Sequence, residues 1–331
     1  MSEVLTAAVI GLGKAGSRFD EEPGRTAPWS HTGAYLALAD RFRIVGAADP
    51  DARNAERYRQ RCPGVPIFPD ATSLLAEIRP DVVSICTPAG RHRADLEAVL
   101  ACPSVKAVWC EKPLATSLAD AEAMVKAVAD RGLPMVVTYN RRWLPMWRRV
   151  KELIEIGAIG DLICLRVAAP NRLHSIGSHA LDLMRFLAGD PNRTVAMALP
   201  QLVETGEPAA AALFDFPSGA YGILQVTGFR AQLVIEAEAI GRKGRISVRE
   251  DSSRLTIERF GKHPEYEGYQ RLSAAGEGRY ASMAQVSVFV EAAAEVATLA
   301  RDPKARCTSD GASALKTQRL IESVVTGAGY A

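Results

Sequence analysis

The sequence has no excess of charge and no long apolar run. Its 40 lysines and arginines nearly balance its 38 aspartates and glutamates, which leaves a formal net charge of +2. It therefore offers no broad basic field to nucleic acid or to an anionic membrane surface. No segment approaches the ~18 uninterrupted apolar residues of a membrane-spanning helix, and the first residues lack the basic start of a signal peptide. We expect a small-molecule partner, with no nucleic acid and no membrane involved.

Cysteine, histidine and lysine are scarce. The six cysteines show no CxxC spacing, which argues against the common zinc and redox motifs and favours a reducing, cytoplasmic location. The five histidines have no second pair of ligands nearby, so we expect no metal site. Only nine lysines accompany 31 arginines. A lysine at the end of a buried strand is therefore a candidate for chemistry rather than filler.

The length of 331 residues suits two domains of the usual ~100–200 residues each. In the first part, strand and helix patterns alternate, which is typical of a parallel, doubly wound (Rossmann) sheet covered on both faces. The expected strands are 5–10, 42–48, 65–68, 81–86, 106–110 and 134–139, and the expected helices are 30–38, 71–78, 91–100 and 117–131. We assign residues 1–142 to a dinucleotide-binding domain.

The pattern changes after residue 142, where strands follow one another with short turns between them. The expected strands are 161–169, 209–216, 221–227, 232–240 and 245–249, and the expected helices are 147–154, 177–188, 280–299 and 312–325. Such a run predicts an α+β domain with a largely antiparallel open sheet. We assign residues 143–331 to substrate binding and oligomerisation, and its final helices can pack back on the first domain.

A glycine motif follows the first expected strand. It matches GxGxxG and consists of Gly11, Leu12, Gly13, Lys14, Ala15 and Gly16. Gly11 permits a tight turn, Gly13 lets the backbone approach a pyrophosphate, and Gly16 lets a helix pack closely on the strand. The N-terminus of that helix would present free N–H groups to the phosphates. The alternative is a glycine-rich turn that binds nothing.

Asp49 ends the second expected strand, where an acid can hydrogen-bond the adenosine ribose. A carboxylate there favours the free 2′-hydroxyl of NAD over the 2′-phosphate of NADP, whereas Arg53, one helical turn later, weakens that preference. Asp49 lies 38 residues after Gly11, although about 20 are usual.

The extra length has a visible source in residues 19–29, which hold two prolines and a glycine and so cannot continue the first helix. Ser30 can cap a new helix after them. This insertion is either a lid or substrate loop, with Trp29 and His31 as its functional members, or a plain surface loop.

Polar segments follow three of the expected strands, at Thr87-Pro88, at Glu111-Lys112-Pro113 and at Tyr139-Asn140. The carboxyl ends of parallel strands meet at one edge of the sheet, where ligands bind. Lys112 is therefore expected to reach into a ligand cleft. For Thr87-Pro88 a simple helix-starting turn is an equal alternative.

A polar cluster precedes and opens the helix expected at 177–188. Its members are Asn171, Arg172, His174, Ser175, His179 and Asp182. His179 and Asp182 are three residues apart and share a helix face; an acid can orient an imidazole, which can then pass a proton to or from a hydroxyl. The alternative is a histidine satisfied by the backbone and an aspartate that caps the helix or pairs at the surface.

A run of arginines surrounds Trp143 between the two domains. It comprises Arg141, Arg142, Arg148 and Arg149. Such a run is either a solvated helix face or a contact for a phosphate or carboxylate of the substrate, with Arg142 and Trp143 as its candidate members.

Together these segments resemble the Gfo/Idh/MocA family of nicotinamide-dependent oxidoreductases along nearly the whole chain. The matching segments are 11–16, 48–49, Thr87-Pro88 with His92 behind it, 111–113, 140–143, 159–160, 177–182 and the Gly241/Gly244 turn. The resemblance implies that Lys112 and His179 are catalytic and that NAD, or alternatively NADP, binds the first domain at the glycine motif, Asp49, Arg53, Thr87, Pro88, His92, Glu111 and Lys112.

The resemblance also implies a substrate that is a sugar, a polyol such as inositol, or a sugar nucleotide. The second sheet would form the interface of a homo-oligomer, either a dimer or a tetramer. One departure is Ser175, because many members carry an aspartate four residues before the histidine. Either His174 substitutes for it, or Lys112 and His179 suffice. A catalytically inactive NAD(H)-binding regulatory protein of the same fold is the alternative function.

Overall fold

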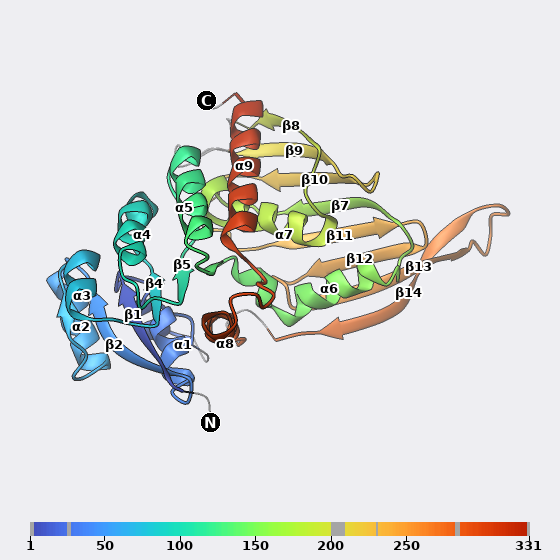
Figure 1. The fold of residues 1–331 in the computed structure, drawn as a ribbon. Helices are drawn as coiled ribbons and strands as arrows, with labels where there is room; N and C mark the ends of the chain where they lie inside the picture. Colours follow the sequence, from blue (N-terminus) through green and yellow to red (C-terminus); the bar gives the residue numbers. More distant parts are fainter. Residues whose placement is uncertain (1–2, 25–27, 200–208, 230, 282–284, 330–331) are drawn as a thin grey trace. The chain divides into compact units, whose positions relative to one another are not determined.

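The computed structural model describes residues 3–24, 28–199, 209–229, 231–281 and 285–329. The chain forms two compact units (Figure 1). The first comprises Met1–Trp143 with Ala284–Leu315, and the second comprises Leu144–Met283 with Lys316–Ala331. The segment Ala284–Leu315, which the sequence analysis assigned to the second domain while allowing it to return, thus clusters with the first unit.

The first unit is built on a six-stranded parallel sheet. Its strands are β1 (Leu5–Ile10), β2 (Phe42–Ala48), β3 (Ile67–Phe68), β4 (Val82–Ile85), β5 (Ala107–Cys110) and β6 (Met135–Val137), in the order β3-β2-β1-β4-β5-β6. The predicted Rossmann sheet is confirmed. The strand order reverses between β1 and β4, so the loops after these two strands flank the crevice in which such sheets bind ligands.

Helices cover both faces of this sheet. They are α1 (His31–Ala37), α2 (Ala52–Arg61), α3 (Ala71–Glu77), α4 (His92–Leu100), α5 (Leu118–Asp130) and α8 (Val288–Arg301), with short 3₁₀ helices η1 (Arg18–Glu21), η2 (Ala89–Arg91) and η3 (Asn140–Trp143). The helices α3, α4 and α5 pack in series over one face, whereas α1 and α8 pack together over the other. Ser30 caps α1 as predicted, because its hydroxyl accepts from the N–H of Gly33 at 2.9 Å.

The helix that starts at the glycine motif is interrupted after a single turn, as the prolines and glycine of residues 19–29 predict. The N–H of Ser17 bonds the carbonyl of Gly13, and the chain then passes through η1. Where α1 begins, the N–H groups of His31 and Thr32 bond the carbonyls of Ala15 and Gly16, each at 3.0 Å. These bonds join residues 16 apart, where helical bonds join residues four apart. The segment between is thus an excursion of about twelve residues inserted into one helix; residues 25–27 of it lie outside the described ranges.

The second unit holds an eight-stranded sheet. Its strands are β7 (Leu162–Ala168), β8 (Arg193–Ala198), β9 (Ala210–Asp215), β10 (Tyr221–Val226), β11 (Glu236–Gly241), β12 (Gly244–Arg249), β13 (Arg254–Lys262) and β14 (Gln270–Arg279), in the order β14-β13-β12-β11-β7-β10-β9-β8. Only β7 and β10 pair in parallel among these strands, so the predicted, largely antiparallel sheet is confirmed.

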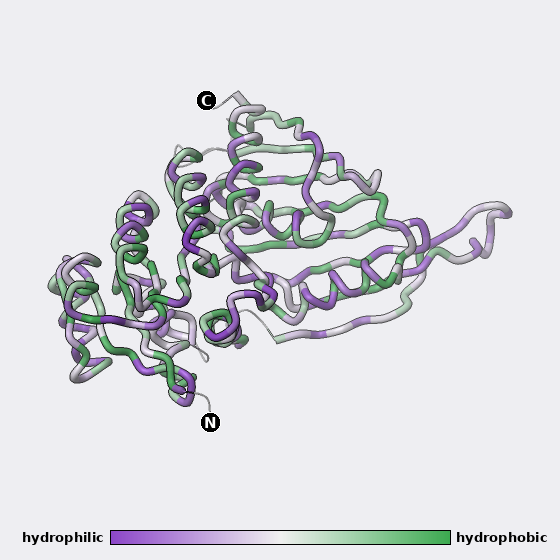
Figure 2. Tube along the Cα trace, viewed as in Figure 1, coloured by the Kyte–Doolittle hydropathy of each residue, from purple (hydrophilic) through white to green (hydrophobic). Residues whose placement is uncertain are grey.

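Helices lie on one face of this second sheet. They are α6 (Pro145–Glu155), the π-helical turn η4 (Leu173–Gly177), α7 (Ser178–Ala188) and the part of α9 (Gly311–Gly327) that follows Leu315. α7 packs on β7 and β10, and α6 packs on α7. Hydrophilic and hydrophobic positions alternate along α6, as its amphipathic sequence predicts (Figure 2).

Three strands, β8, β13 and β14, are absent from the sequence-based expectation. β13 and β14 form a hairpin with exposed positions on both faces, so their residues lack the apolar alternation that marks a half-buried strand; the outer end of the hairpin is hydrophilic (Figure 2). The strand expected at 232–240 begins only at Glu236, and the helix expected at 280–299 is α8, from Val288 to Arg301. Residues 282–284 lie outside the described ranges.

Candidate functional site

The glycine turn and the loop after β4 lie against each other in the first unit. Gly11 has a φ of +89°, and a Cβ atom placed on it would lie 2.7 Å from the backbone of Cys86 and Thr87. A Cβ on Gly16 would collide with the carbonyl oxygen of Gly11. A Cβ on Gly13 would meet no protein atom within 4 Å. The fold therefore requires glycine at 11 and 16, whereas the space at Gly13 is open for a ligand to approach the backbone.

Asp49 fastens this turn to the end of β2. Its carboxylate accepts from the N–H of Leu12 at 2.7 Å, from the N–H of Asp51 at 2.8 Å and from the side-chain amide of Asn54 at 3.1 Å. A carboxylate has about four acceptor positions, so capacity remains for a ribose hydroxyl. Arg53 is exposed and grips Asp51 with two hydrogen bonds, which lower the pKa of Asp51 to about 2. The guanidinium of Arg53, which could otherwise favour the 2′-phosphate of NADP, is therefore paired with the carboxylate of Asp51.

His92 joins the loop after β4 to the loop after β5. The buried imidazole places Nε2 2.8 Å from the carbonyl oxygen of Thr87 and Nδ1 3.0 Å from that of Leu114. The hydroxyl of Thr87 donates to Asp95 at 2.6 Å, and Pro88 precedes η2 as its N-cap. Thr87-Pro88 therefore starts a helix and also lines the edge of the sheet beside Gly11.

Glu111 and Lys112 follow β5 directly, and Lys112 precedes a cis proline, Pro113. The Glu111 carboxyl lies 3.1 Å from Nε2 of His31. Burial raises the pKa of Glu111, but the interaction with His31, the charge of Lys112 and a hydrogen bond from Thr138 outweigh it, so the net shift is downward. Glu111 is therefore a carboxylate whose negative charge lies beside Lys112.

The predicted run of arginines is divided by the structure. Arg141 and Arg142 are buried rather than on a solvated helix face, whereas Arg149 pairs with Glu152 at the surface. Arg142 donates to the carbonyl of Thr308 and to the hydroxyl of Ser313, both at 3.0 Å.

Trp143 is buried as well, and its indole N–H donates to Glu295 of α8 at 3.1 Å. Like the hydrogen bonds of Arg142, this bond joins the end of the Met1–Trp143 segment to the Ala284–Leu315 segment of the same unit.

In the second unit, the polar cluster is organised by the π-turn η4. The N–H of Gly177 bonds the carbonyl of Arg172 at 3.0 Å, and the hydroxyl of Ser178 donates to the carbonyl of Ser175 at 2.6 Å. π-Turns inside helices are frequent at functional sites. The turn leaves His174 exposed and starts α7 just before His179, which is 5% exposed.

Asp182 and Asn171 bind neighbouring segments of the same unit. The Asp182 carboxyl accepts from the hydroxyl of Thr317 at 2.9 Å and lies 3.8 Å from the guanidinium of Arg185. The side-chain amide of Asn171 donates to the carbonyl of Gln232, which fixes the loop after β10. The contact of Asp182 with α9 spans 135 residues and has no signal in the local sequence pattern.

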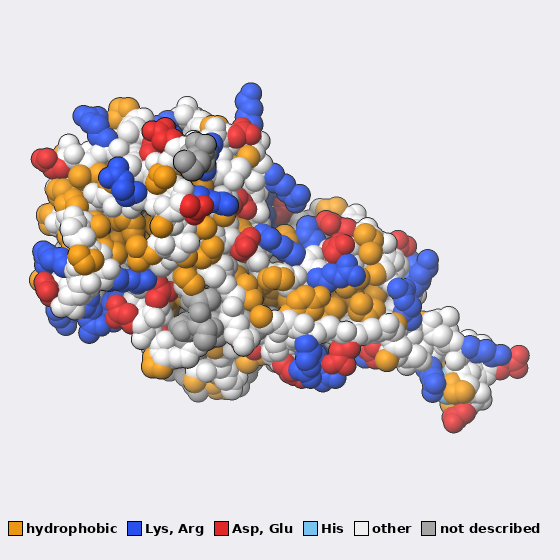
Figure 3. Space-filling view, turned by 90° about the horizontal axis from the view of Figure 1, so that it is seen from below, with side chains coloured by type: hydrophobic (Ala, Val, Ile, Leu, Met, Phe, Trp, Pro, Cys, Tyr) orange, Lys and Arg blue, Asp and Glu red, His pale blue; other side chains and the backbone are white. Residues whose placement is uncertain are grey.

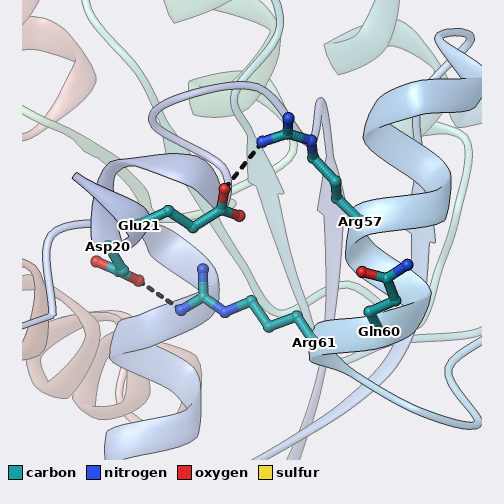
Figure 4. Close-up of a pocket in the computed structure, with 5 residues that line it drawn as sticks. All are labelled: Asp20, Glu21, Arg57, Gln60 and Arg61. Carbon is teal, nitrogen blue, oxygen red and sulfur yellow. Dashed lines mark hydrogen bonds and ion pairs between the residues drawn. The ribbon is translucent and has the colours of Figure 1, made fainter.

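Sequence reasoning missed the anchor of the insertion. Asp20 and Glu21 of η1 face Arg57, Gln60 and Arg61 of α2 across a surface depression (Figure 4). Arg57 pairs with Glu21 at 3.2 Å and Arg61 with Asp20 at 2.5 Å. Asp20 also accepts from the N–H of Trp29 and the hydroxyl of Ser30. The sequence signal for this contact is the acidic run Asp20-Glu21-Glu22 together with Arg57 and Arg61, which are four residues apart and so share a helix face.

Within the described ranges, no three His, Cys, Asp or Glu side chains gather closely enough to bind a metal ion. Among the same residues, no helix combines the length and apolarity needed to cross a membrane. One face of the surface carries basic and acidic side chains interspersed with each other (Figure 3).

Two family models match the chain. The model described as "Oxidoreductase family, NAD-binding Rossmann fold" matches residues 5–139, and that described as "GFO/IDH/MocA C-terminal domain" matches residues 171–247. Among curated proteins, D-apiose dehydrogenase of Paraburkholderia graminis is 32% identical over 203 residues, which cover 56% of this chain and 54% of that enzyme. The chain thus spans about half the length of this relative.

Other similar proteins align over more of the chain. Myo-inositol 2-dehydrogenase of Thermotoga maritima is 26% identical over 291 residues, which cover 79% of this chain and 81% of that enzyme. Among solved structures, an oxidoreductase from Agrobacterium radiobacter in complex with NAD+, L-tartaric acid and magnesium superposes with a TM-score of 0.78 and 22% identity, covering 98% of this chain and 96% of the other. At that identity the superposition supports the fold alone.

Proposed function

The chain belongs to the Gfo/Idh/MocA family of NAD-binding oxidoreductases, and on that premise we propose that it transfers a hydride between NAD and a hydroxyl-bearing carbon of a sugar, an inositol-like polyol or a sugar nucleotide. The observation that carries the proposal is the juxtaposition of the glycine turn with the Thr87 loop. It leaves open space only at Gly13 among the three motif glycines, where a pyrophosphate needs close backbone approach.

The residues of the first unit fit a dinucleotide. Gly11 to Gly16 would cradle the pyrophosphate, and Asp49 would accept from the ribose. Thr87, Pro88 and Glu111 would line the nicotinamide end, and the buried His92 would hold the loop that carries Thr87. When bound, the nicotinamide accepts or supplies the hydride. Arg53 would lie at the rim, held on Asp51.

Lys112 and His179 are the proposed catalytic residues. The Lys112 ammonium would stabilise negative charge that develops on the substrate oxygen, and His179 would take the hydroxyl proton during oxidation and return it during reduction. Because Ser175 cannot serve as a carboxylate base, the exposed His174 beside it is the remaining candidate for a relay to solvent. Asn171, Arg172 and Asp182 would hold the loops around these histidines in place.

We expect NADH to bind at least about tenfold more tightly than NADPH, because the Asp49 carboxylate repels a 2′-phosphate and like charges in contact are strongly unfavourable. The measurement is a fluorescence titration of the purified protein with each reduced cofactor. Equal affinities, or tighter binding of NADPH, would contradict the assignment of Asp49.

The test of the function is reduced-nicotinamide absorbance with NAD and a panel of polyols, aldoses and sugar nucleotides. Turnover of at least one compound is the expected result. Tight NAD binding without turnover across the panel would instead support the alternative, an inactive NAD(H)-binding regulatory protein for which Ser175 is the main argument.

We also propose that the face of the second sheet opposite its helices pairs with another copy of the chain. Val195, Leu213 and Ile223 are direct cross-strand neighbours on this face, and Leu213 and Val195 are 53% and 49% exposed. Further along the sheet, both signs of charge occur in pairs such as Arg166 with Glu238. Apolar residues beside charges of both signs suit a self-complementary interface.

We therefore expect a dimer or tetramer of the 35.6 kDa chain, and expect Leu213→Glu to shift it to the monomer because a carboxylate would be buried against apolar residues. Sedimentation velocity measures this. Leu36→Glu, which changes a similarly exposed leucine of the first unit, is the matched control. A monomeric wild-type protein at micromolar concentration would refute the proposal.

A cytoplasmic location is the final part of the proposal. All six cysteines are free, and four of them are buried, which is the state expected in a reducing compartment.

A further inference from the structure

His31 lies in a buried chain of hydrogen bonds behind Glu111 and Lys112. The imidazole is fully buried and stacks on Trp109, with ring centroids 3.6 Å apart. Its Nε2 lies 3.1 Å from the Glu111 carboxyl, and its Nδ1 lies 2.9 Å from the hydroxyl of Ser84. The Ser84 hydroxyl lies 2.7 Å from that of Tyr35. These groups come from α1, β4 and the end of β5, all in the first unit.

Only one arrangement of hydrogens satisfies this chain with a neutral imidazole. Burial lowers the pKa of His31, although Glu111 opposes the shift, so the ring is neutral near pH 7. A carboxylate can only accept; Nε2 must then carry the hydrogen, and Nδ1 must accept from Ser84. Tyr35, whose pKa is raised by burial, stays protonated and donates to Ser84.

We propose that His31 is a positioning residue that holds Glu111 as an oriented carboxylate beside Lys112, and that Ser84 selects the tautomer this requires. The inference rests on the proposed function for its kinetic consequence only. The Lys112 ammonium would then contact the substrate oxygen while the fixed negative charge of Glu111 lies beside it. The backbone N–H of His31 bonds the carbonyl of Ala15. The hydrogen bond that fixes His31 therefore also joins it to the glycine turn.

The groups that face Glu111 determine how its titration should respond. They are His31 from α1, Lys112 and Cys110 from β5 and its end, Cys86 from the end of β4, and the hydroxyl of Thr138 after β6. Burial raises the pKa of both thiols, so they are neutral near pH 7. His31 and Lys112 thus oppose the upward effect of burial on the pKa of Glu111, with help from Thr138. Removing the His31 donor leaves burial less opposed and raises that pKa.

The first experiment is nitrogen-15 NMR of the histidine side chains in the full-length protein. The chain has only five histidines, and His31→Gln identifies the signal of His31 by its loss. We expect protonated Nε2, unprotonated Nδ1 and no titration between pH 6 and 8. An Nδ1–H tautomer, or a titration near the ordinary pKa of about 6.5, would overturn the proposal. This experiment needs no turnover, so it decides the proposal even if no substrate is found.

The second experiment compares pH profiles of kcat with a substrate found in the panel. We expect His31→Leu to lower kcat at least about tenfold, the size of one lost hydrogen bond to a charged group, and to move the acid limb upward by about one pH unit. His31→Gln, which retains an N–H donor, should return the acid limb of the kcat profile toward its wild-type pH. Tyr35→Phe, which removes one buried hydroxyl of the same cluster, should leave kcat within about twofold.

The contrary outcomes are specific. A uniform fall in kcat at every pH in His31→Leu, without recovery in His31→Gln, would show a merely structural role. An equal effect of Tyr35→Phe would show the same. If His31→Leu fails to fold, the limb position in His31→Gln and the NMR tautomer decide.

Discussion

Replacing Lys112 with alanine is expected to lower kcat by at least about a hundredfold, the range for loss of one catalytic donor or acid/base group. The Kd for NADH should change little, because the glycine turn and Asp49 are built without this side chain. Steady-state kinetics and a fluorescence titration with NADH measure the two quantities separately.

Lys106→Ala is the matched control for this prediction. Lys106 precedes β5 and pairs with Asp81 at 2.7 Å, whereas Lys112 follows the same strand at the carboxyl end. We expect Lys106→Ala to keep kcat within about twofold, because partly exposed ion pairs contribute little. Near-wild-type turnover in Lys112→Ala would remove Lys112 from the mechanism.

The second large effect is expected from two glycines of the same motif, with opposite readouts. A Cβ on Gly13 would meet no protein atom within 4 Å, so Gly13→Val should leave Tm within about 2 °C of wild type while weakening NADH binding at least about a hundredfold, or about 2.7 kcal/mol. A Cβ on Gly16 collides with backbone. Overpacking of this kind costs about 1–3 kcal/mol or more, so Gly16→Ala should lower Tm by roughly 5 °C or more.

Differential scanning calorimetry and NADH titration distinguish the two variants. Gly261→Val is the control, because Gly261 on β13 also faces open space but belongs to the second unit. It should leave NADH binding unchanged. If Gly13→Val binds NADH as wild type does, the open space at Gly13 is not where the cofactor binds.

Most of the first unit could be predicted from sequence because its elements carry local signals, although α2 was not among the expected helices. Buried parallel strands read as apolar runs, and Ser30, Asp70 and Ser117 mark helix starts, each accepting an N–H bond from the residue three positions on. The β13 and β14 strands could not be predicted in this way, because strands with exposed positions on both faces carry no such pattern. In β8 only alternate positions are exposed, but these include the apolar Val195 and Met197, so polarity does not mark the exposed face.

The candidate site was predictable only as a set of strand ends. Spacing indicated that Gly11, Thr87 and Lys112 follow parallel strands. Because β1, β4 and β5 are neighbours in the sheet, these three residues come to lie at the same edge. It could not indicate that His31 reaches Glu111 80 residues away, or that Arg142 is buried on Thr308. Such contacts depend on tertiary packing across the fold, whereas charge runs and helical spacing report only on near neighbours.

Because the first helix is interrupted, the segment between Ser17 and Ser30 could be replaced by another loop. Hydrogen bonds to the carbonyls of Ala15 and Gly16 already close its base, so a different loop would leave and re-enter the helix at the same two points. Lengthening it is thermodynamically mild, since each doubling of a flexible loop costs only about 0.6 kcal/mol. Loops grafted or randomised there would sample new surface beside the glycine turn without rebuilding the sheet.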